Sequence, residues 1–390
     1  MEDVTRYIKP AVERELWART AGRCEFKGCN RLVYKSPVTQ ERVNIAERAH
    51  IYSFSKDGPR GWGPFVTNRK KLNDLANLLL VCHDCHETID QANPITRYPA
   101  SRLLAWKREH EERVRVVTGI HPSKNSHVIL YGGKIGEESS PLEADLAVEA
   151  MFPEWYPAEE RPTELAMLSE HEDATELFWK TEAAHLRASF ERHIRPRIQD
   201  AKPNHFSVFA RASQPLLILL GTLLTDKVPV EVYQLQREPV SWRWQGDSNG
   251  FYFRVVPPEK MDGEPVLVVS ASARISPDRI TAVVGSNISL WELMVDHCDN
   301  DFLKSRAQLS AFRESARRLL NRIAEAHGQS TPLKIFPAMP VSCAVELGRI
   351  RMPKADMPWI VYDQSNKLGR FIRALEIGGS YDGQDDRSHS

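Results

Sequence analysis

Residues 77–90, NLLLVCHDCHETID, decide the fold of the front part of the chain. The segment opens with an apolar run that is typical of a buried strand, and it continues through two cysteines separated by two residues. A second close pair of cysteines lies upstream, and two such pairs can supply four thiolates to one tetrahedral Zn²⁺. The spacing predicts a structural zinc site formed by Cys24, Cys29, Cys82 and Cys85. The alternative, buried free cysteines, would not require paired spacing.

The composition indicates a soluble globular protein. Its 390 residues are 42% hydrophobic and 27% charged, and this length suggests two or three domains. No apolar run approaches the roughly 18 residues needed to cross a bilayer, and the charged N-terminus is unlike a signal peptide. We therefore expect a cytoplasmic protein with no membrane partner, in which cysteines are thiols or metal ligands and not disulfides. Cys298 and Cys343 lie far apart and are predicted to be ordinary apolar residues.

The formal net charge of zero hides an asymmetry between the two parts of the chain. Residues 1–118 contain 21 Lys and Arg against 15 Asp and Glu, a balance of +6. The remaining residues contain 31 against 37, a balance of −6. This polarity indicates that the front part is the region that meets a polyanion, although an uneven surface charge without a partner is an open alternative.

A domain boundary is expected near residue 120. Residues 56–71, KDGPRGWGPFVTNRKK, have the composition of a long loop, and residues 99–119 have the apolar spacing of a helix that stops at Gly119. Strand-like and helical segments then alternate, which predicts an α/β fold with a mostly parallel sheet. The expected division is a first domain at 1–118, a linker at 119–126 and a second domain at 127–390.

The second domain contains a faint internal repeat. FARASQPLLILLG at 209–221 and FPAMPVSCAVELG at 336–348 both place Phe and Gly twelve positions apart, and each leads to a VY pair that ends at Tyr233 or Tyr362. Chance similarity between two βαβ units would also explain the match. A true repeat would imply two Rossmann-like halves whose strand-to-helix turns face a shared crevice, where α/β sheets bind ligands.

Two histidines and one asparagine are interleaved with the cysteine pairs. AHI at 49–51 contains His50, and NLLLVCHDCH at 77–86 contains Asn77 and His86. In this pattern the first part of the chain resembles the HNH nucleases, which have the ββα-metal fold. The resemblance covers about 65 residues, with the cysteine pairs and the three other residues in register.

The resemblance implies roles for these residues in phosphodiester cleavage. His50 would be the general base, His86 a ligand of a catalytic divalent cation, and Asn77 would steady the His50 loop or approach the metal. A neutral imidazole can take a proton from water, and a divalent cation stabilises charge that develops on phosphate oxygens. The zinc would be structural.

One metal ligand of many HNH proteins has no counterpart here, because the residue before His50 is Ala49. Asp90 lies four residues after His86 and therefore on the same face of the expected helix. A carboxylate and an imidazole in this arrangement suit Mg²⁺ or Mn²⁺, so Asp90 is the candidate for the missing ligand. The alternative is a solvated acid on the helix surface.

The Gly-rich loop carries basic residues that would contact phosphates without sequence preference. These candidates for DNA binding are Arg60, Arg69, Lys70 and Lys71. A solvated basic loop is the alternative.

The second domain is similar to SAVED domains through FPAMPVSCAVELGR at 336–349, in which a strand ends at a Pro-containing turn and a helix follows. SAVED domains resemble two fused CARF-like Rossmann halves, in agreement with the repeat. The pairing resembles the HNH–SAVED effectors of bacterial cyclic-oligonucleotide anti-phage signalling (CBASS). It implies a cyclic di- or trinucleotide activator, a homo-oligomer that is a dimer or larger once activated, and degradation of double-stranded DNA with little sequence preference.

Topology nominates the residues that would hold this activator. Helix N-termini and hydroxyls suit phosphates, arginine is their charged partner, and aromatic rings stack on bases. The candidates are Arg211, Ser213, Gln214, Trp242, Trp244, Ser270, Ser272, Arg274 and Ser342. For Ser342 the alternative is a plain helix N-cap, and for the two tryptophans it is a place in the core.

Two other functions compete with a ligand-gated endonuclease. One is a restriction-type HNH nuclease whose C-terminal domain recognises modified DNA, although the −6 balance of that domain disfavours DNA binding. The other is a non-catalytic, zinc-containing DNA-binding regulator with a metabolite sensor. The set of His50, Asn77 and His86 disfavours the regulator, since binding alone needs no general base.

Overall fold

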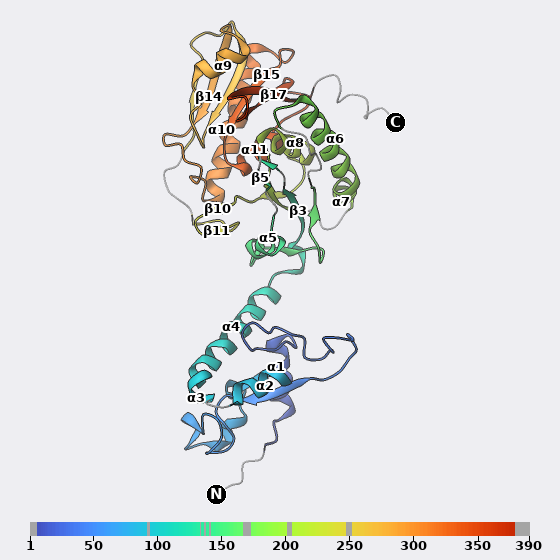
Figure 1. Cartoon of the computed structure of the whole chain (residues 1–390), viewed down its shortest axis with the longest axis vertical. Coiled ribbons are helices and arrows are strands. Elements are labelled where there is room, and N and C mark those ends of the chain that lie inside the picture. The colour runs from blue at the N-terminus through green and yellow to red at the C-terminus, as the bar shows by residue number, and fades with distance from the viewer. Residues whose placement is uncertain are drawn as a thin grey trace. The chain divides into compact units, whose positions relative to one another are not determined.

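The chain forms two compact units in the computed structural model, Met1–His121 and Pro122–Ser390, each described here by itself (Figure 1). The residues described are 6–91, 94–132, 134–135, 138–139, 142–166, 173–200, 205–246 and 252–378. No helix within these ranges is long and apolar enough to cross a lipid bilayer.

The first unit is a small ββα arrangement supported by further helices. Its helices and strands are α1 (Pro10–Thr20), β1 (Ala46–His50), β2 (Leu78–Cys82), α2 (His83–Asp90), α3 (Pro94–Arg97) and α4 (Ala100–Thr118). Three 3-10 turns lie between the strands: η1 (Gly63–Phe65), η2 (Arg69–Asn73) and η3 (Leu75–Asn77). The strands pair antiparallel, with Ala46 opposite Cys82 and His50 opposite Leu78.

The apolar run in β2 is the centre of this unit. Every residue of Leu78–Cys82 is buried, and Leu16 of α1 and Leu103 of α4 belong to the same core cluster. Helix α2 begins immediately after Cys82, so the strand places the start of the helix without a flexible connection. Residues at the two ends of β2 are therefore held at fixed positions relative to α2.

The second unit begins with a five-stranded sheet. The elements of this half are β3 (Asn125–Gly132), β4 (Lys134–Ile135), β5 (Glu138–Ser139), α5 (Ala144–Met151), β6 (Tyr156–Pro157), β7 (Thr163–Glu164), α6 (Glu176–His193), α7 (Arg195–Gln199), β8 (Phe206–Arg211), α8 (Gln214–Leu224) and β9 (Val230–Val232). The strand order is β6-β3-β8-β9 with β7 beside β3, and these pairs are parallel. Residues 122–124 form a 3-10 turn, so β3 begins inside the segment expected to be a linker.

The second half contains a six-stranded sheet. Its elements are β10 (Gln236–Arg237), β11 (Val240–Ser241), β12 (Arg254–Val256), β13 (Glu264–Ser270), α9 (Pro277–Val284), β14 (Ile288–Met294), α10 (Arg306–His327), β15 (Leu333–Ala338), α11 (Val341–Arg349), β16 (Trp359–Ser365) and β17 (Arg370–Ile377). The strand order is β12-β14-β13-β15-β16-β17, with a parallel centre and an antiparallel strand at each edge. Hairpin β10-β11 lies outside both sheets.

The internal repeat corresponds to equivalent packing in the two halves. Phe209 of β8 stacks on Tyr233 with ring centroids 4.3 Å apart, and Phe336 of β15 stacks on Tyr362 at 4.5 Å. A third ring meets each phenylalanine edge-on, Trp242 at 5.3 Å in the first half and Phe371 at 5.1 Å in the second. Chance similarity does not account for two matched aromatic contacts, so β8-α8-β9 and β15-α11-β16 are equivalent units.

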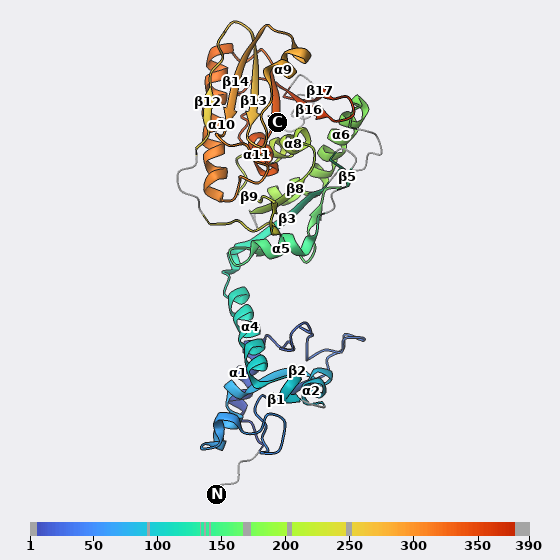
Figure 2. The same ribbon diagram turned by 60° about the vertical axis from the view of Figure 1, so that its left-hand side comes forward.

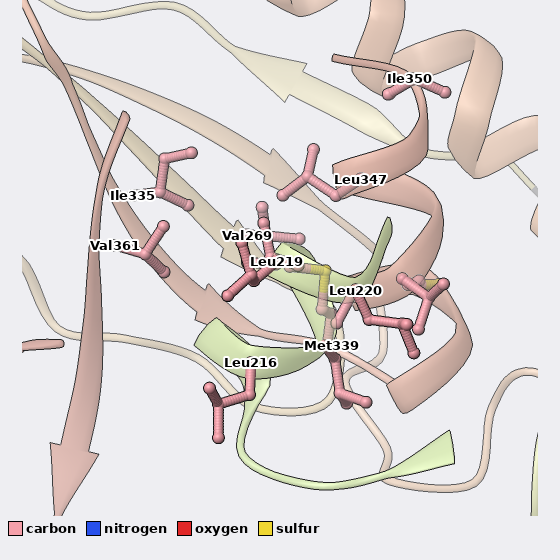
Figure 3. Packing of buried hydrophobic residues seen from close by; sticks show 14 of the residues in the cluster. Leu216, Leu219, Leu220, Val269, Ile335, Met339, Leu347, Ile350 and Val361 are labelled. Atoms are coloured by element: carbon pink, nitrogen blue, oxygen red, sulfur yellow. The ribbon is translucent and has the colours of Figure 1, made fainter. Parts of the chain in front are cut away.

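The helices of the repeat, α8 and α11, pack directly on each other between the two sheets. They lie side by side between α6 and α10 in both views (Figures 1 and 2). Leu216, Leu219 and Leu220 of α8 share one buried cluster with Leu347 of α11 (Figure 3). Strand residues such as Val269 border the same cluster, so one core joins the two halves.

The matched glycines of the repeat are the point where these helices cross. A Cβ on Gly221 would lie 2.0 Å from the Val345 carbonyl oxygen, and a Cβ on Gly348 would lie 2.0 Å from the Ile218 carbonyl oxygen. Both neighbours are backbone atoms, which cannot rotate away. Glycine twelve positions after the phenylalanine of the repeat is therefore required by close helix packing.

We expect Gly348→Ala to lower the free energy of unfolding of the second unit by about 3 kcal/mol, because an inserted methyl group forces a packed backbone apart. The measurement is the denaturant midpoint of the transition that reports this unit. Gly246→Ala is the matched control, since a Cβ there meets nothing within 4 Å. Equal midpoints for the two variants would show that the crossing tolerates a wider separation.

Candidate functional site

The four paired cysteines converge in the first unit. The Sγ atoms of Cys24, Cys29, Cys82 and Cys85 all lie within 4.8 Å of one another. Cys29 Sγ is 3.9 Å from Cys82 Sγ, and the backbone N–H of Cys82 donates to Cys24 Sγ at 3.3 Å. The two pairs are 53 positions apart along the chain, and the burial of β2 brings them together.

The chemistry of this cluster fits a soft divalent cation. Burial raises the pKa of the Cys24 thiol to about 12, and burial together with the neighbouring sulfurs also raises the pKa of Cys85. Four thiolates this close repel one another unless a cation lies among them. Tetrahedral Zn²⁺ with four sulfur ligands matches both the number and the proximity of these atoms.

His50 is the last residue of β1, the strand that pairs with β2. Its Nε2 lies 2.9 Å from Asn73 Oδ1. Burial is the main cause of a lowered pKa of His50, and the nearby charges of Arg6 and His86 add to it. The hydrogen bond with Asn73 opposes this shift without reversing it. The imidazole is therefore neutral at pH 7, the state that a general base requires.

Asn77 is 1% exposed and binds backbone groups around His50. Its Oδ1 accepts from the N–H of Tyr52 at 2.8 Å, and its Nδ2 donates to the carbonyl oxygens of Tyr52 and Leu72 at 3.0 and 2.9 Å. The Asn77 carbonyl also accepts from the N–H of Ile51 at 2.8 Å. These bonds hold the chain that follows His50, which is one of the two roles considered for this residue.

His86 and Asp90 lie one turn apart on α2. His86 Nε2 is 3.8 Å from Asp90 Oδ2, and both side chains are about one-third exposed. An imidazole nitrogen and a carboxylate oxygen at this separation can bind the same divalent cation. His50 responds electrostatically to both residues, so all three lie in one region of the unit.

Arg60 corrects one expectation. It was predicted to contact DNA phosphates, but its side chain is only 3% exposed. Its guanidinium donates to the carbonyl oxygen of Ile51 at 2.5 Å, to that of Ile89 at 3.0 Å, and to Asp90 Oδ1 at 2.7 Å. Arg60 therefore joins the chain after His50 to α2, and it leaves Asp90 Oδ2 as the oxygen that faces His86.

The other basic residues of the loop remain accessible. Arg69, Lys70 and Lys71 begin η2; Lys70 and Lys71 are exposed, and Arg69 is partly exposed. The guanidinium of Arg69 lies over the ring of Trp62, 5.1 Å from its centroid. These three residues therefore stay candidates for phosphate contact, as the sequence predicts.

In the second unit, the turns at the carboxyl ends of the parallel strands lie next to one another. Gln214 Oε1, at the start of α8, accepts from the N–H of Met339 at 3.3 Å. The N–H of Ser272 donates to the carbonyl oxygen of Ala338 at 2.7 Å. The turns after β8, β13 and β15 therefore adjoin, as the crevice expected from the repeat requires.

Several candidate ligand residues occupy these turns. Arg211 ends β8, and Ser213 is the N-cap of α8 with 6% exposure. Arg274 is 42% exposed at its side chain and donates to the Val295 carbonyl oxygen at 2.6 Å. Ser342 is fully buried at the start of α11, where its Oγ donates to Gln234 Oε1 at 2.8 Å.

Three other candidates do not face this crevice. Ser270 is fully buried, and strand alternation places it with Val268 on the sheet face away from α8 and α11. Trp242 is 2% exposed and belongs to the core around Phe209. Trp244 lines a separate cavity of about 310 Å³ together with His205 and with residues of β9, α10 and α11. The structure therefore places these three side chains outside the crevice that the repeat predicts.

Sequence reasoning missed two positions that complete the sites. Asn73 contacts His50 from η2, and Gln234 binds both Oγ and N–H of Ser342 across 108 residues. Asn73 lies only four residues before Asn77 in a basic loop, and nothing in its spacing distinguishes it. The signal for Gln234 was its place directly after the Tyr233 of the repeat.

Comparison with protein families identifies both parts of the chain. Residues 24–93 match the model described as HNH endonuclease. Residues 186–377 match the model described as SMODS-associated and fused to various effectors sensor domain, or SAVED. The first match contains the cysteine cluster, His50, Asn77 and His86, and the second contains both halves of the repeat. No curated protein matches the chain.

Several solved structures resemble this chain over part of their own length. The Acinetobacter baumannii Cap4 SAVED/CARF-domain containing receptor with the cyclic trinucleotide 3'3'3'-cAAA is 13% identical, with a TM-score of 0.44. The match covers 72% of this chain and 56% of that chain. The Moraxella osloensis Cap4 SAVED/CARF-domain containing receptor is 12% identical over 71% of this chain and 57% of that chain, with a TM-score of 0.36. The chain thus spans a little over half the length of these proteins.

The predicted fold class is confirmed by the structure and the two family matches. The chain is α/β, with an HNH endonuclease domain near its N-terminus and a SAVED sensor domain towards its C-terminus. The prediction of an HNH endonuclease domain is confirmed with it.

Proposed function

We propose that this chain, an HNH endonuclease domain joined to a SAVED cyclic-oligonucleotide sensor domain, is a ligand-gated effector of anti-phage defence (CBASS). A cyclic di- or trinucleotide bound to the second unit activates cleavage of double-stranded DNA with little sequence preference. The observation that carries this proposal is the presence of a complete His50, Asn77 and His86 set in the same chain as the sensor fold. The protein acts in the cytoplasm, where infecting DNA is accessible.

The side chains of the first unit supply the parts of a hydrolysis. His50, half-buried and neutral, accepts a proton from the attacking water. His86 Nε2 and Asp90 Oδ2 would hold a Mg²⁺ or Mn²⁺ ion, which stabilises negative charge on the phosphate oxygens when it is bound. Asn77 and Arg60 keep the chain after His50 at a fixed position relative to α2.

The surface of the first unit supports DNA binding without base readout. Arg69, Lys70 and Lys71 present positive charge in the loop between β1 and β2. Contacts to phosphates give affinity that does not depend on sequence and that falls with added salt. A Zn²⁺ ion in the cysteine cluster supports this loop and α2 and takes no part in the chemistry.

The adjoining turns of the second unit are the proposed site of the activator. The N-terminus of α8 carries the positive end of the helix dipole at these turns, which suits a phosphate. Arg211, Ser272 and Arg274 are the accessible side chains at these turns, Gln214 and Ser342 hold the turns in place, and Ser213 is the N-cap residue of α8. Ligand binding is proposed to promote assembly of a dimer into a larger homo-oligomer.

Plasmid cleavage tests this proposal. The full chain is incubated with plasmid and Mg²⁺, alone and with a panel of cyclic di- and trinucleotides, and light scattering follows assembly in the same samples. Cleavage only with a cyclic nucleotide is the expected result. Cleavage of methylated plasmid without any nucleotide would replace gating with restriction. DNA retarded in a gel but intact under all conditions would indicate a non-catalytic regulator.

A further inference from the structure

The hydrogen bond between His50 and Asn73 has a defined direction. Asn73 ends η2, and its Oδ1 lies 2.9 Å from His50 Nε2 while its Nδ2 lies 3.2 Å from the carbonyl oxygen of Tyr7. A carbonyl oxygen can only accept, so the amide must turn its Nδ2 towards Tyr7. Oδ1 is then the atom that faces the imidazole, and Oδ1 can only accept as well.

The proton of the neutral imidazole is placed by this arrangement. An accepting Oδ1 requires that Nε2 of His50 carries the hydrogen, which leaves Nδ1 with the lone pair. Burial keeps this imidazole uncharged near neutral pH. The basic nitrogen is therefore Nδ1 and not Nε2.

The position of Asn73 is itself supported by the Asn77 side chain. Asn77 Nδ2 donates to the carbonyl oxygen of Leu72, the residue before Asn73, at 2.9 Å. Leu72 is 1% exposed, so the end of η2 is anchored in the core of the unit. The two asparagines hold opposite parts of the same site: Asn77 binds the chain after His50, and Asn73 binds the imidazole.

We infer that Asn73 is a positioning residue that selects the Nε2–H tautomer of His50 and presents Nδ1 as the base for phosphodiester hydrolysis. The catalytic consequence rests on the proposed nuclease function, whereas the tautomer does not. The charged or titratable groups that act on His50 are Arg6 before α1 and His86 and Asp90 on α2. Asn73 adds none, because its side chain is a neutral amide, and a neutral acceptor orients the ring without stabilising the imidazolium as a carboxylate would.

Nitrogen NMR of the full chain tests the tautomer without using activity. The 13 histidines are labelled with ¹⁵N, and the signal that disappears in His50→Ala is assigned to His50. The expected spectrum shows protonated Nε2 in the unmodified chain and a mixture of tautomers in Asn73→Ala. Protonated Nδ1 in the unmodified chain, or an unchanged spectrum in Asn73→Ala, would overturn the inference.

Two substitutions then separate positioning from folding. Asn73→Ala is expected to reduce kcat about 100-fold with KM and zinc content unchanged, since misplacement of a reacting group by about 1 Å has this effect. Asn73→Asp, nearly the same shape, retains an acceptor for Nε2–H and adds a charge. It is expected to recover part of kcat while moving the acidic limb of the pH profile about one unit or more upwards.

Asn68→Ala is the matched control, because Asn68 lies five residues earlier, is exposed and makes no capping bond with its side chain. It is expected to match the unmodified chain in kcat and in the NMR spectrum. An Asn73→Asp profile that coincides with that of the unmodified chain would contradict the inference. If the unmodified chain cleaves no DNA, the proposed function fails, and the NMR spectra still decide the role of Asn73.

Discussion

Replacing Cys82 by serine is expected to abolish tight zinc binding and to unfold the first unit, while the second unit keeps its own cooperative transition. The four sulfurs lie within 4.8 Å of one another, and the strand that carries Cys82 is the centre of the core. Structural zinc contributes about 10–16 kcal/mol of apparent binding free energy in small zinc-dependent folds, far more than a small core supplies by itself. Zinc content by atomic emission and differential scanning calorimetry measure the two effects.

The calorimetric control for this prediction is Cys298→Ser. Cys298 is half-buried and lies outside the cysteine cluster, in the second unit. This variant is expected to retain one equivalent of zinc and the thermal transition of the first unit. A Cys82→Ser chain that still holds one zinc and melts like the unmodified protein would exclude the four-sulfur site.

Removal of the His50 imidazole is expected to reduce DNA cleavage by about 10³-fold, because a positioned general base contributes between about 10² and 10⁴ in rate. Zinc content should not change, since His50 lies outside the cysteine cluster. Affinity for the cyclic nucleotide should not change either, since the proposed nucleotide site is in the second unit and His50 is in the first. Burial lowers the pKa of His50 below its ordinary value of 6.5. Cleavage by the unmodified chain should therefore persist at neutral pH and fall only as the pH drops through that lowered value.

His83→Ala provides the matched histidine control for the cleavage assay. His83 is 66% exposed at the start of α2 and lies 3.5 Å from Glu47, so its loss removes an imidazole without touching the buried site. It is expected to cleave at close to the rate of the unmodified chain. Full activity in His50→Ala would assign the base to another residue.

The sequence predicted the elements that depend on spacing. Two close pairs of cysteines can together supply four ligands to one ion. Their spacing therefore already indicated the cluster that the structure contains. The repeat at Phe209 and Phe336 likewise predicted two equivalent halves. Each half needs an aromatic residue and, twelve positions later, a glycine, because both halves pack in the same way.

Side-chain environment could not be predicted in the same way. Arg60 lies in a Gly-rich, basic loop that is typical of surface phosphate contacts. Its guanidinium is nevertheless enclosed by three carbonyl oxygens and Asp90. Trp242 follows a strand in a polar neighbourhood, yet it packs edge-on against Phe209 in the core. In each case the partners are distant in sequence, so local composition holds no information about them.

The sequence by itself determined which residues are candidates for a metal site and a general base, because residue type and spacing decide whether such groups can act together. It determined the α/β class and the two-part organisation through periodicity. Only the tertiary structure decided which residues are available: it buried Arg60, placed Asn73 on His50, and turned Ser270 away from the crevice. The physical reason is that burial and hydrogen bonding depend on contacts between segments tens to hundreds of residues apart.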